Sequence, residues 1–321
     1  MSRLLLVTIA QAALIAACSP GGSDAGGEPA AGAKAEAQHK PAATSLFGEP
    51  LYAPAPSPAV MAQYEEAKAA YEANPADADA LIWYGRRAGY LGDYAQAIAI
   101  FSEGIEKHPG DARMLRHRGH RYISIRKFDE AIADFEKAMT LIEGKPDEIE
   151  PDGMPNAQNI PLTTLHGNIR YHLALAHYLK QEWEPARRIF AADLEETQND
   201  DGIVASTHWL YMILRRMGRD DEAAAVLEPI TEDMTIIENT YYHRACLFYK
   251  GLIPYEEMLP DDVEGVGTAG LVYGFANWHL YNGQQDKAFE IMNRLVDGAS
   301  WPAFGYIAAE ADLAAYDARK K

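Results

Sequence analysis

Two stretches of this sequence repeat each other at a spacing of 34 residues. The segment GDYAQAIAIFSEGIEKHP (92–109) aligns with RKFDEAIADFEKAMTLIE (126–143) over its whole length. Four pairs of equivalent residues share the spacing: Gly85 and Gly119, Tyr94 and Phe128, Ala97 and Ala131, and Phe101 and Phe135. Self-similarity at a period of about 20–50 residues indicates a solenoid, in which each unit buries its apolar face against its neighbours.

The repeated residues suit helices that pack closely together. Glycine lets the first helix of a unit approach the second, and alanine lets the next helix nest against the pair. The aromatic side chains then fill the seam between units. The sequence therefore predicts an all-α fold built from helix–turn–helix units.

This pattern resembles the tetratricopeptide repeat (TPR) family, whose helix–turn–helix unit has the same length. The resemblance implies a solenoid that winds as a right-handed superhelix. Weaker copies continue the pattern, although Glu256 stands where the fifth copy should carry a small residue. We expect units near 78–111, 112–145, 167–203, 204–236, 237–268 and 269–302, with capping helices at 58–74 and 302–319.

A loop insertion separates the second unit from the third. Residues 146–166 contain four prolines, which prevent a regular helix. A connection of this length inside a solenoid is uncommon. The sequence leaves two interpretations open: a functional lid, or a disordered segment.

The N-terminus resembles the signal of a bacterial lipoprotein. Arg3 precedes an apolar run from Leu4 to Ile15, and the tetrapeptide IAAC ends at Cys18. The resemblance implies a signal peptide at residues 1–17 and lipidation of Cys18. Ser19 follows the cysteine, and by the sorting rule of such lipoproteins this favours the outer membrane. We expect a lipid-anchored protein at the bacterial outer membrane that faces the periplasm.

Residues 18–57 are expected to form a flexible, disordered tether. Ala, Gly, Pro and Ser dominate this segment, so it has little apolar surface to bury against its ordering entropy. The tether should end where Ser57 and Pro58 provide a cap and a first residue for the first helix.

Composition and motifs argue against several classes of function. The formal net charge is −18, whereas nucleic-acid binding depends mainly on basic side chains that neutralise phosphates. The sequence GVGTAG (265–270) matches a dinucleotide-binding motif but lacks the strand that must precede it. Cys246 lies among apolar residues, which favours a buried, unreactive thiol. The sequence predicts no nucleic-acid partner, no catalytic residue and no cofactor.

One stretch of this acidic chain is strongly basic. The segment RMLRHRGHRYISIRK (113–127) holds five arginines, one lysine and two histidines. His117 and His120 are three residues apart on an expected helix, but zinc needs further ligands and the neighbouring arginines would repel a cation. No metal site is predicted here.

The TPR resemblance implies that the first helix of each unit faces a concave groove in which peptide partners lie. The N-terminal half of this groove would be rich in arginine, which pairs with carboxylates. The C-terminal half would be rich in tyrosine, which offers a large contact area. The residues expected to line it are Arg86, Tyr90, Arg113, Arg116, His120, Tyr171, His208, Arg216, Tyr249 and Tyr281.

These features predict a non-catalytic interaction scaffold or adaptor in the cell envelope, which binds a protein or peptide carrying acidic groups. Other interpretations stay open. Anionic glycans or lipid headgroups could occupy the groove, or its arginines could face solvent without a ligand. The chain could be a hydrolase-type enzyme that uses the 146–166 loop and the groove histidines. It could also be a self-associating structural module.

Overall fold

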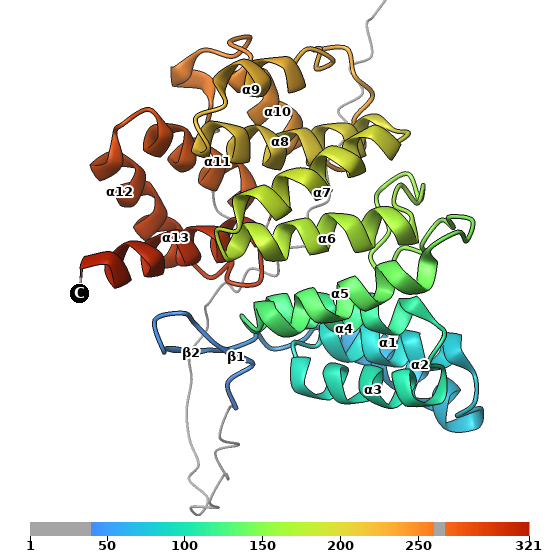
Figure 1. The fold of residues 1–321 in the computed structure, drawn as a ribbon. Coiled ribbons are helices and arrows are strands. Elements are labelled where there is room, and N and C mark those ends of the chain that lie inside the picture. Colours follow the sequence, from blue (N-terminus) through green and yellow to red (C-terminus); the bar gives the residue numbers. More distant parts are fainter. Residues whose placement is uncertain (1–39, 260–266, 321) are drawn as a thin grey trace, which may run out of the picture. The chain divides into compact units, whose positions relative to one another are not determined.

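The computed structural model describes residues 40–259 and 267–320 (Figure 1). The expected signal peptide, Cys18 and the tether up to residue 39 lie outside the described residues. The described part contains thirteen α-helices, one 3₁₀ turn and one two-stranded sheet, so the predicted all-α repeat fold is confirmed. None of the helices in these ranges is long and apolar enough to cross a membrane.

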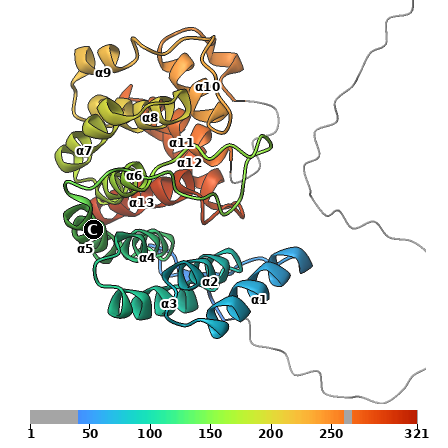
Figure 2. The same cartoon turned by 90° about the vertical axis from the view of Figure 1, so that its right-hand side faces the viewer.

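Consecutive helices form hairpins that stack one on the next (Figure 2). Ser57 caps the first helix by accepting the N–H of Val60 at 3.3 Å, and Pro58 is its first residue, as the sequence predicts. The helices are α1 (Pro58–Ala73), α2 (Ala78–Tyr90), α3 (Tyr94–Lys107), α4 (Ala112–Ser124), α5 (Phe128–Ile142), α6 (Leu165–Leu179), α7 (Trp183–Glu196), α8 (Asp200–Arg216), α9 (Asp220–Val226), α10 (Thr240–Tyr249), α11 (Ala269–Tyr281), α12 (Gln285–Val296) and α13 (Phe304–Lys320).

Two glycines set the distance between paired helices. A Cβ atom at Gly85 would lie 2.5 Å from Cε1 of Phe101, and one at Gly119 would lie 2.8 Å from Cζ of Phe135. Both rings are almost fully buried. The hairpins α2–α3 and α4–α5 therefore use the same glycine–phenylalanine contact, which confirms the physical interpretation of the repeat.

The turn after the first helix of a hairpin needs a left-handed backbone. Gly92, Gly218 and Gly283 supply it with φ angles of 81°, 70° and 78°. Arg126 and Gln181 hold the same place with φ angles of 65° and 60°, which is unfavourable for residues with a side chain. Both side chains reach α13, and these contacts hold the two residues in this conformation.

The fourth and fifth units depart from the expected hairpin. α9 has seven residues, and α10 is followed by a 3₁₀ turn (Tyr255–Glu257) in place of a second helix. Glu256 is exposed in this turn, whereas a helix would place it at a packing position. The unit expected at 237–268 thus has only its first helix within the described residues.

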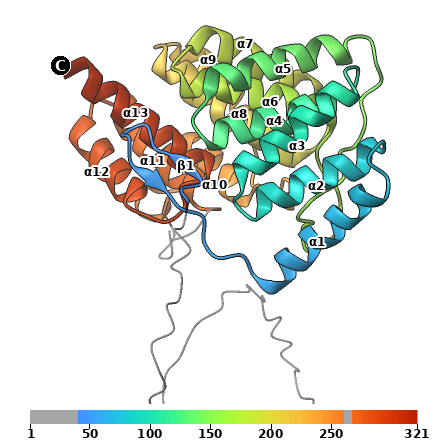
Figure 3. The same cartoon turned by 90° about the horizontal axis from the view of Figure 1, so that it is seen from below.

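The end of the expected tether is folded. β1 (Ala43–Thr44; Figure 3) pairs antiparallel with β2 (Pro50–Leu51). Ala43 of β1 belongs to the same apolar cluster as Trp301. The indole N–H of Trp301 donates to the carbonyl of Tyr52 at 2.9 Å. The predicted boundary of the tether at residue 57 is therefore wrong, because a distant part of the chain supplies an apolar surface for this short segment.

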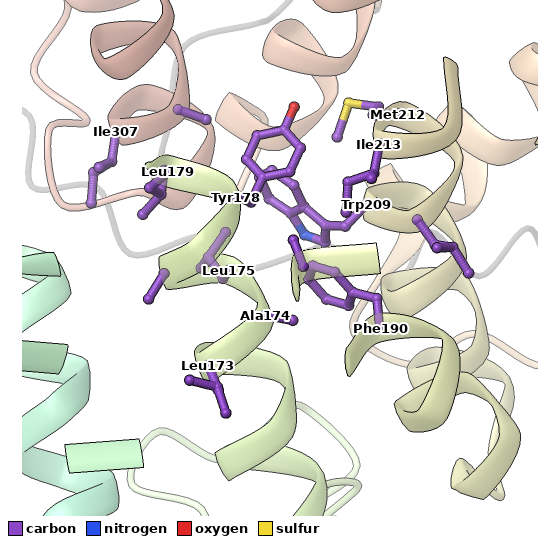
Figure 4. Close-up of a cluster of buried hydrophobic side chains, with 14 of the residues drawn as sticks. Leu173, Ala174, Leu175, Tyr178, Leu179, Phe190, Trp209, Met212, Ile213 and Ile307 are labelled. Carbon is purple, nitrogen blue, oxygen red and sulfur yellow. The ribbon is translucent and has the colours of Figure 1, made fainter. Parts of the chain in front are cut away.

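The C-terminal helix returns to the middle of the chain. α13 packs against α11, α12 and α6, while α11 also contacts α8. The main core runs without a break from α4 to α13, and Figure 4 shows its centre, where Tyr178 meets the edge of Trp209 at a centroid distance of 4.9 Å. Parts of α6 and α8 that were expected to line an open groove are consequently covered by α11 and α13.

Candidate peptide-binding groove

Four of the predicted groove residues surround one cavity. Arg86 and Tyr90 reach it from α2, and Arg116 and His120 reach it from α4. The cavity has a volume of about 120 Å³, and three further residues complete its wall: Phe101, His117 and Arg121. We call this cavity the basic pocket.

The 146–166 insertion is an ordered element beside the basic pocket. Ile149 forms an antiparallel bridge with Thr164, and the N–H of Glu150 donates to the carbonyl of Thr163 at 2.9 Å. The insertion then crosses α2, where it meets two arginines. Nη1 of Arg86 donates to the carbonyl of Pro151 at 2.8 Å, and Nη1 of Arg87 donates to the carbonyl of Gly153 at 3.0 Å. The interpretation of residues 146–166 as disordered is therefore wrong.

Glu150 provides the carboxylate nearest to the basic pocket. It is buried, with Oε2 at 2.9 Å from Nε of Arg116 and Oε1 at 3.8 Å from Nε2 of His117. Nδ2 of Asn168 on α6 also donates to Glu150, at 3.1 Å. The insertion thus places one carboxylate against Arg116 and fixes it from the opposite side.

The histidines around the basic pocket are neutral at physiological pH. Burial is the main cause that lowers the pKa of His117, His120 and His172, and the positive charges of Arg116 and Arg121 lower it further. For His172 the pKa falls to about 3. A neutral imidazole with a pKa this far from 7 is poorly suited to general acid–base catalysis, so the hydrolase-type alternative finds no support at this place.

Arg113 lies elsewhere, although the sequence placed it in the same groove. Its guanidinium pairs with Asp111 and with Asp79, each at 2.6 Å. Asp79 sits at the start of α2 and Arg113 at the start of α4, so this pair links two consecutive units rather than lining the basic pocket.

The remaining predicted residues contact the chain's own helices. Tyr171 accepts the indole N–H of Trp209 at 2.7 Å, Arg216 pairs with Asp312, and Arg215 stacks on Tyr281 at 4.5 Å. His208 is fully buried between two rings, Tyr242 at 4.7 Å and Tyr249 at 5.8 Å. The C-terminal half of the predicted groove is therefore filled from within the chain.

Four residues of this region were not predicted from the sequence: Arg87, His117 as a groove residue, Arg121 and Glu150. Arg121 and His117 belong to the basic stretch that was singled out, but the repeat positions favoured Arg116 and His120 over them. Glu150 lies in the insertion, for which no repeat position exists. Among the described residues, no group of three or more His, Cys, Asp or Glu is arranged to hold a metal ion.

Comparisons with known proteins find only distant similarities. No family model and no curated protein matches the chain. Among solved structures, a tetratricopeptide repeat protein from Parabacteroides merdae has a TM-score of 0.47 with 16% identity, covering 79% of this chain and 92% of that one. YrrB, a TPR protein with an unusual peptide-binding site, has a TM-score of 0.42 with 18% identity, covering 80% and 100%. The type IV pilus biogenesis factor PilW has a TM-score of 0.44 with 12% identity, covering 74% and 90%.

These similarities are too distant to assign a role. The fold is assigned from the chain's own geometry. The 34-residue period, the stacked helical hairpins and the glycine–phenylalanine contact repeated in two of them give this chain an α-helical repeat fold similar to that of tetratricopeptide repeat proteins.

Proposed function

We propose that this protein is a non-catalytic interaction scaffold that binds an extended, acidic segment of a protein partner on α2 and α4. One observation carries the proposal. Over four consecutive residues of the insertion, Arg116 pairs with the carboxylate of Glu150, Arg86 donates to the carbonyl of Pro151 and Arg87 donates to the carbonyl of Gly153. The insertion thus lies on this surface as an extended segment with a carboxylate, and an acidic peptide in extended conformation would use the same donors in its place.

The donors on α2 are held in place before any partner arrives. The guanidinium of Arg86 lies 4.4 Å from the ring centroid of Trp83, and that of Arg87 lies 5.1 Å from the same ring. Such stacking restricts both side chains, so less conformational entropy is lost when they bind. The two arginines are also only partly buried, which leaves them within reach of solvent.

We expect charge reversal on α2 to weaken partner capture. The variant Arg86→Glu with Arg87→Glu removes two charge-assisted donors, so capture of a partner from envelope extract, followed by crosslinking and mass spectrometry, should fall at least about tenfold. Arg116 is left unchanged, since its loss would strand the buried carboxylate of Glu150. Capture by the wild type should also weaken as salt rises.

The matched control is Arg187→Glu with Arg188→Glu, the same two charge reversals on α7. This variant should capture the partner as the wild type does. Capture that survives both the α2 reversal and high salt would place the partner on another surface.

The cell-envelope role rests on the N-terminal sequence. We propose that Cys18 carries the lipid anchor, because the tetrapeptide IAAC follows a short apolar run. Growth with a radiolabelled fatty acid should label the wild-type protein, and the label should be absent from Cys18→Ala. Equal labelling of both proteins, or of neither, would contradict this site.

A further inference from the structure

The basic pocket holds more positive charge than its surroundings balance. Arg86, Arg116 and Arg121 all line it. Among the described residues, Glu150 is the only carboxylate that forms an ion pair with any of these three arginines. Asp152, the next carboxylate of the insertion, forms no ion pair with them. Glu150 contacts Arg116 alone, so the guanidinium groups of Arg86 and Arg121 leave a local excess of positive charge.

The guanidinium groups of Arg116 and Arg121 are incompletely paired. Nε of Arg116 is buried and has no aligned hydrogen-bond acceptor, although Glu150 lies nearby. The guanidinium of Arg121 lies 5.3 Å from the ring centroid of Tyr94 and forms no ion pair within the described ranges. Arg121 is partly exposed, so its guanidinium is accessible to an anion, and Nε of Arg116 is a buried donor that Glu150 does not fully satisfy.

The positive charges of the cluster repel one another. Burial is the main cause that lowers the pKa of both Arg116 and Arg121, and repulsion from the neighbouring arginines lowers each pKa further. For Arg116, the charge of Glu150 acts in the opposite direction. An anion bound between these arginines would relieve this repulsion.

We propose that the basic pocket is a binding site for a phosphate group, either inorganic phosphate or the phosphate monoester of a small molecule. Two of the three guanidinium charges have no carboxylate in contact, which matches a doubly charged anion better than a single carboxylate. The volume of about 120 Å³ is well above the ~10–15 Å³ that one water molecule requires, so a tetrahedral anion of five atoms fits. The imidazoles of His117 and His120 complete the wall beside the arginines.

This site goes beyond the proposed function, because it would bind phosphate whether or not a protein partner is present. It shares Arg86 and Arg116 with the surface that carries the insertion. Arg121 belongs to the basic pocket alone, since it makes no contact with residues 150–153 among the hydrogen bonds and ion pairs of the described residues. Arg121 therefore separates the two proposals.

The test is thermal unfolding of the intact chain in inorganic phosphate, in glycerol 3-phosphate and in chloride at the same ionic strength. Phosphate at ten times its Kd should raise the Tm by roughly 3–6 °C relative to chloride. Arg121→Gln should lose this shift, and its Tm in chloride should equal or exceed that of the wild type, because a repulsive charge is gone. Arg187→Gln on α7 should keep the full shift.

A Tm that is the same in phosphate and in chloride would overturn the proposal, as would an Arg121→Gln protein that keeps the shift. If Arg121→Gln is less stable than expected, phosphate binding by this variant is measured by calorimetric titration of the folded protein at low temperature instead of by the Tm. Tighter binding of glycerol 3-phosphate than of phosphate identifies a monoester as the ligand, and the reverse identifies the free ion. Loss of phosphate binding with unchanged partner capture in Arg121→Gln would separate this site from the peptide surface.

Discussion

Replacement of Glu310 by alanine should destabilise the folded protein by about 3–5 kcal/mol, because it leaves a buried guanidinium without its counter-ion. Glu310 on α13 has no exposed surface, and Oε2 accepts from Nη2 of Arg126 at 2.6 Å and from its Nε at 3.1 Å. The Arg126 side chain is itself 3% exposed. Neither group can turn to water when the other is removed, so the desolvation penalty of Arg126 remains uncompensated.

This pair joins three segments that are far apart in the sequence. Arg126, in the turn between α4 and α5, also donates to the carbonyl of Ser124 at 2.6 Å and to that of Trp301 at 3.0 Å. The N–H of Leu46, in the β1–β2 hairpin, donates to Oε1 of Glu310. Loss of Glu310 should therefore loosen the hairpin and α13 together with the turn.

Urea unfolding followed by circular dichroism measures the change in stability, and hydrogen exchange at the amide of Leu46 reports the hairpin. The matched control is Glu184→Ala, which removes an exposed carboxylate paired with Arg187 three residues on. This control should leave the unfolding midpoint unchanged. A Glu310→Ala protein as stable as the control would show that the buried pair contributes nothing to closure of the fold.

Most of the architecture follows from short-range patterns in the sequence. The period of 34 residues predicts the hairpins because the contact between Gly85 and Phe101 recurs between Gly119 and Phe135. The start of α1 follows from the cap at Ser57. These features depend on residues within one unit or its neighbour, so a single sequence contains what is needed to find them.

Contacts between distant units could not be predicted in the same way. Arg126 and Gln181 stand where other hairpins have glycine, and the sequence gives no reason for the exception. The reason is that their side chains bind Glu310 and Asp312 on α13, more than 100 residues away. The repeat pattern predicts which helix faces inward, but it does not predict that the chain's own last helices will cover that face.

The candidate site likewise has one part that the repeat pattern predicts and another part that it does not. Arg86, Tyr90, Arg116 and His120 come together because they share the inward face of two consecutive helices, which the repeat positions predict. The tyrosine-rich half shares that face as well, but α11 and α13 pack onto it. Glu150 could not be found from the repeat, because it belongs to the insertion.

Replacement of Gly305 by alanine should cost at least about 3 kcal/mol, at the upper end of the usual cost of overpacking. A Cβ atom at this position of α13 would lie 2.1 Å from the carbonyl oxygen of Ala269 and 2.6 Å from the backbone nitrogen of Gly270. At Gly119 the obstructing group is a phenylalanine ring, which can tilt. At Gly305 it is the backbone of α11, which can yield only if the two helices separate.

The substitution Gly110→Ala is the control, because it makes the same chemical change where no atom lies within 4 Å of the added Cβ. It should be neutral or should stabilise the protein by up to about 1 kcal/mol, since alanine restricts the unfolded chain. Urea unfolding measures both variants, and loss of protection from hydrogen exchange along α13 distinguishes undocking of that helix from a uniform loss of stability. Equal stability of the two variants would mean that α13 can shift on α11 without cost, and the close approach of these helices would then contribute nothing to covering the face of α6 and α8.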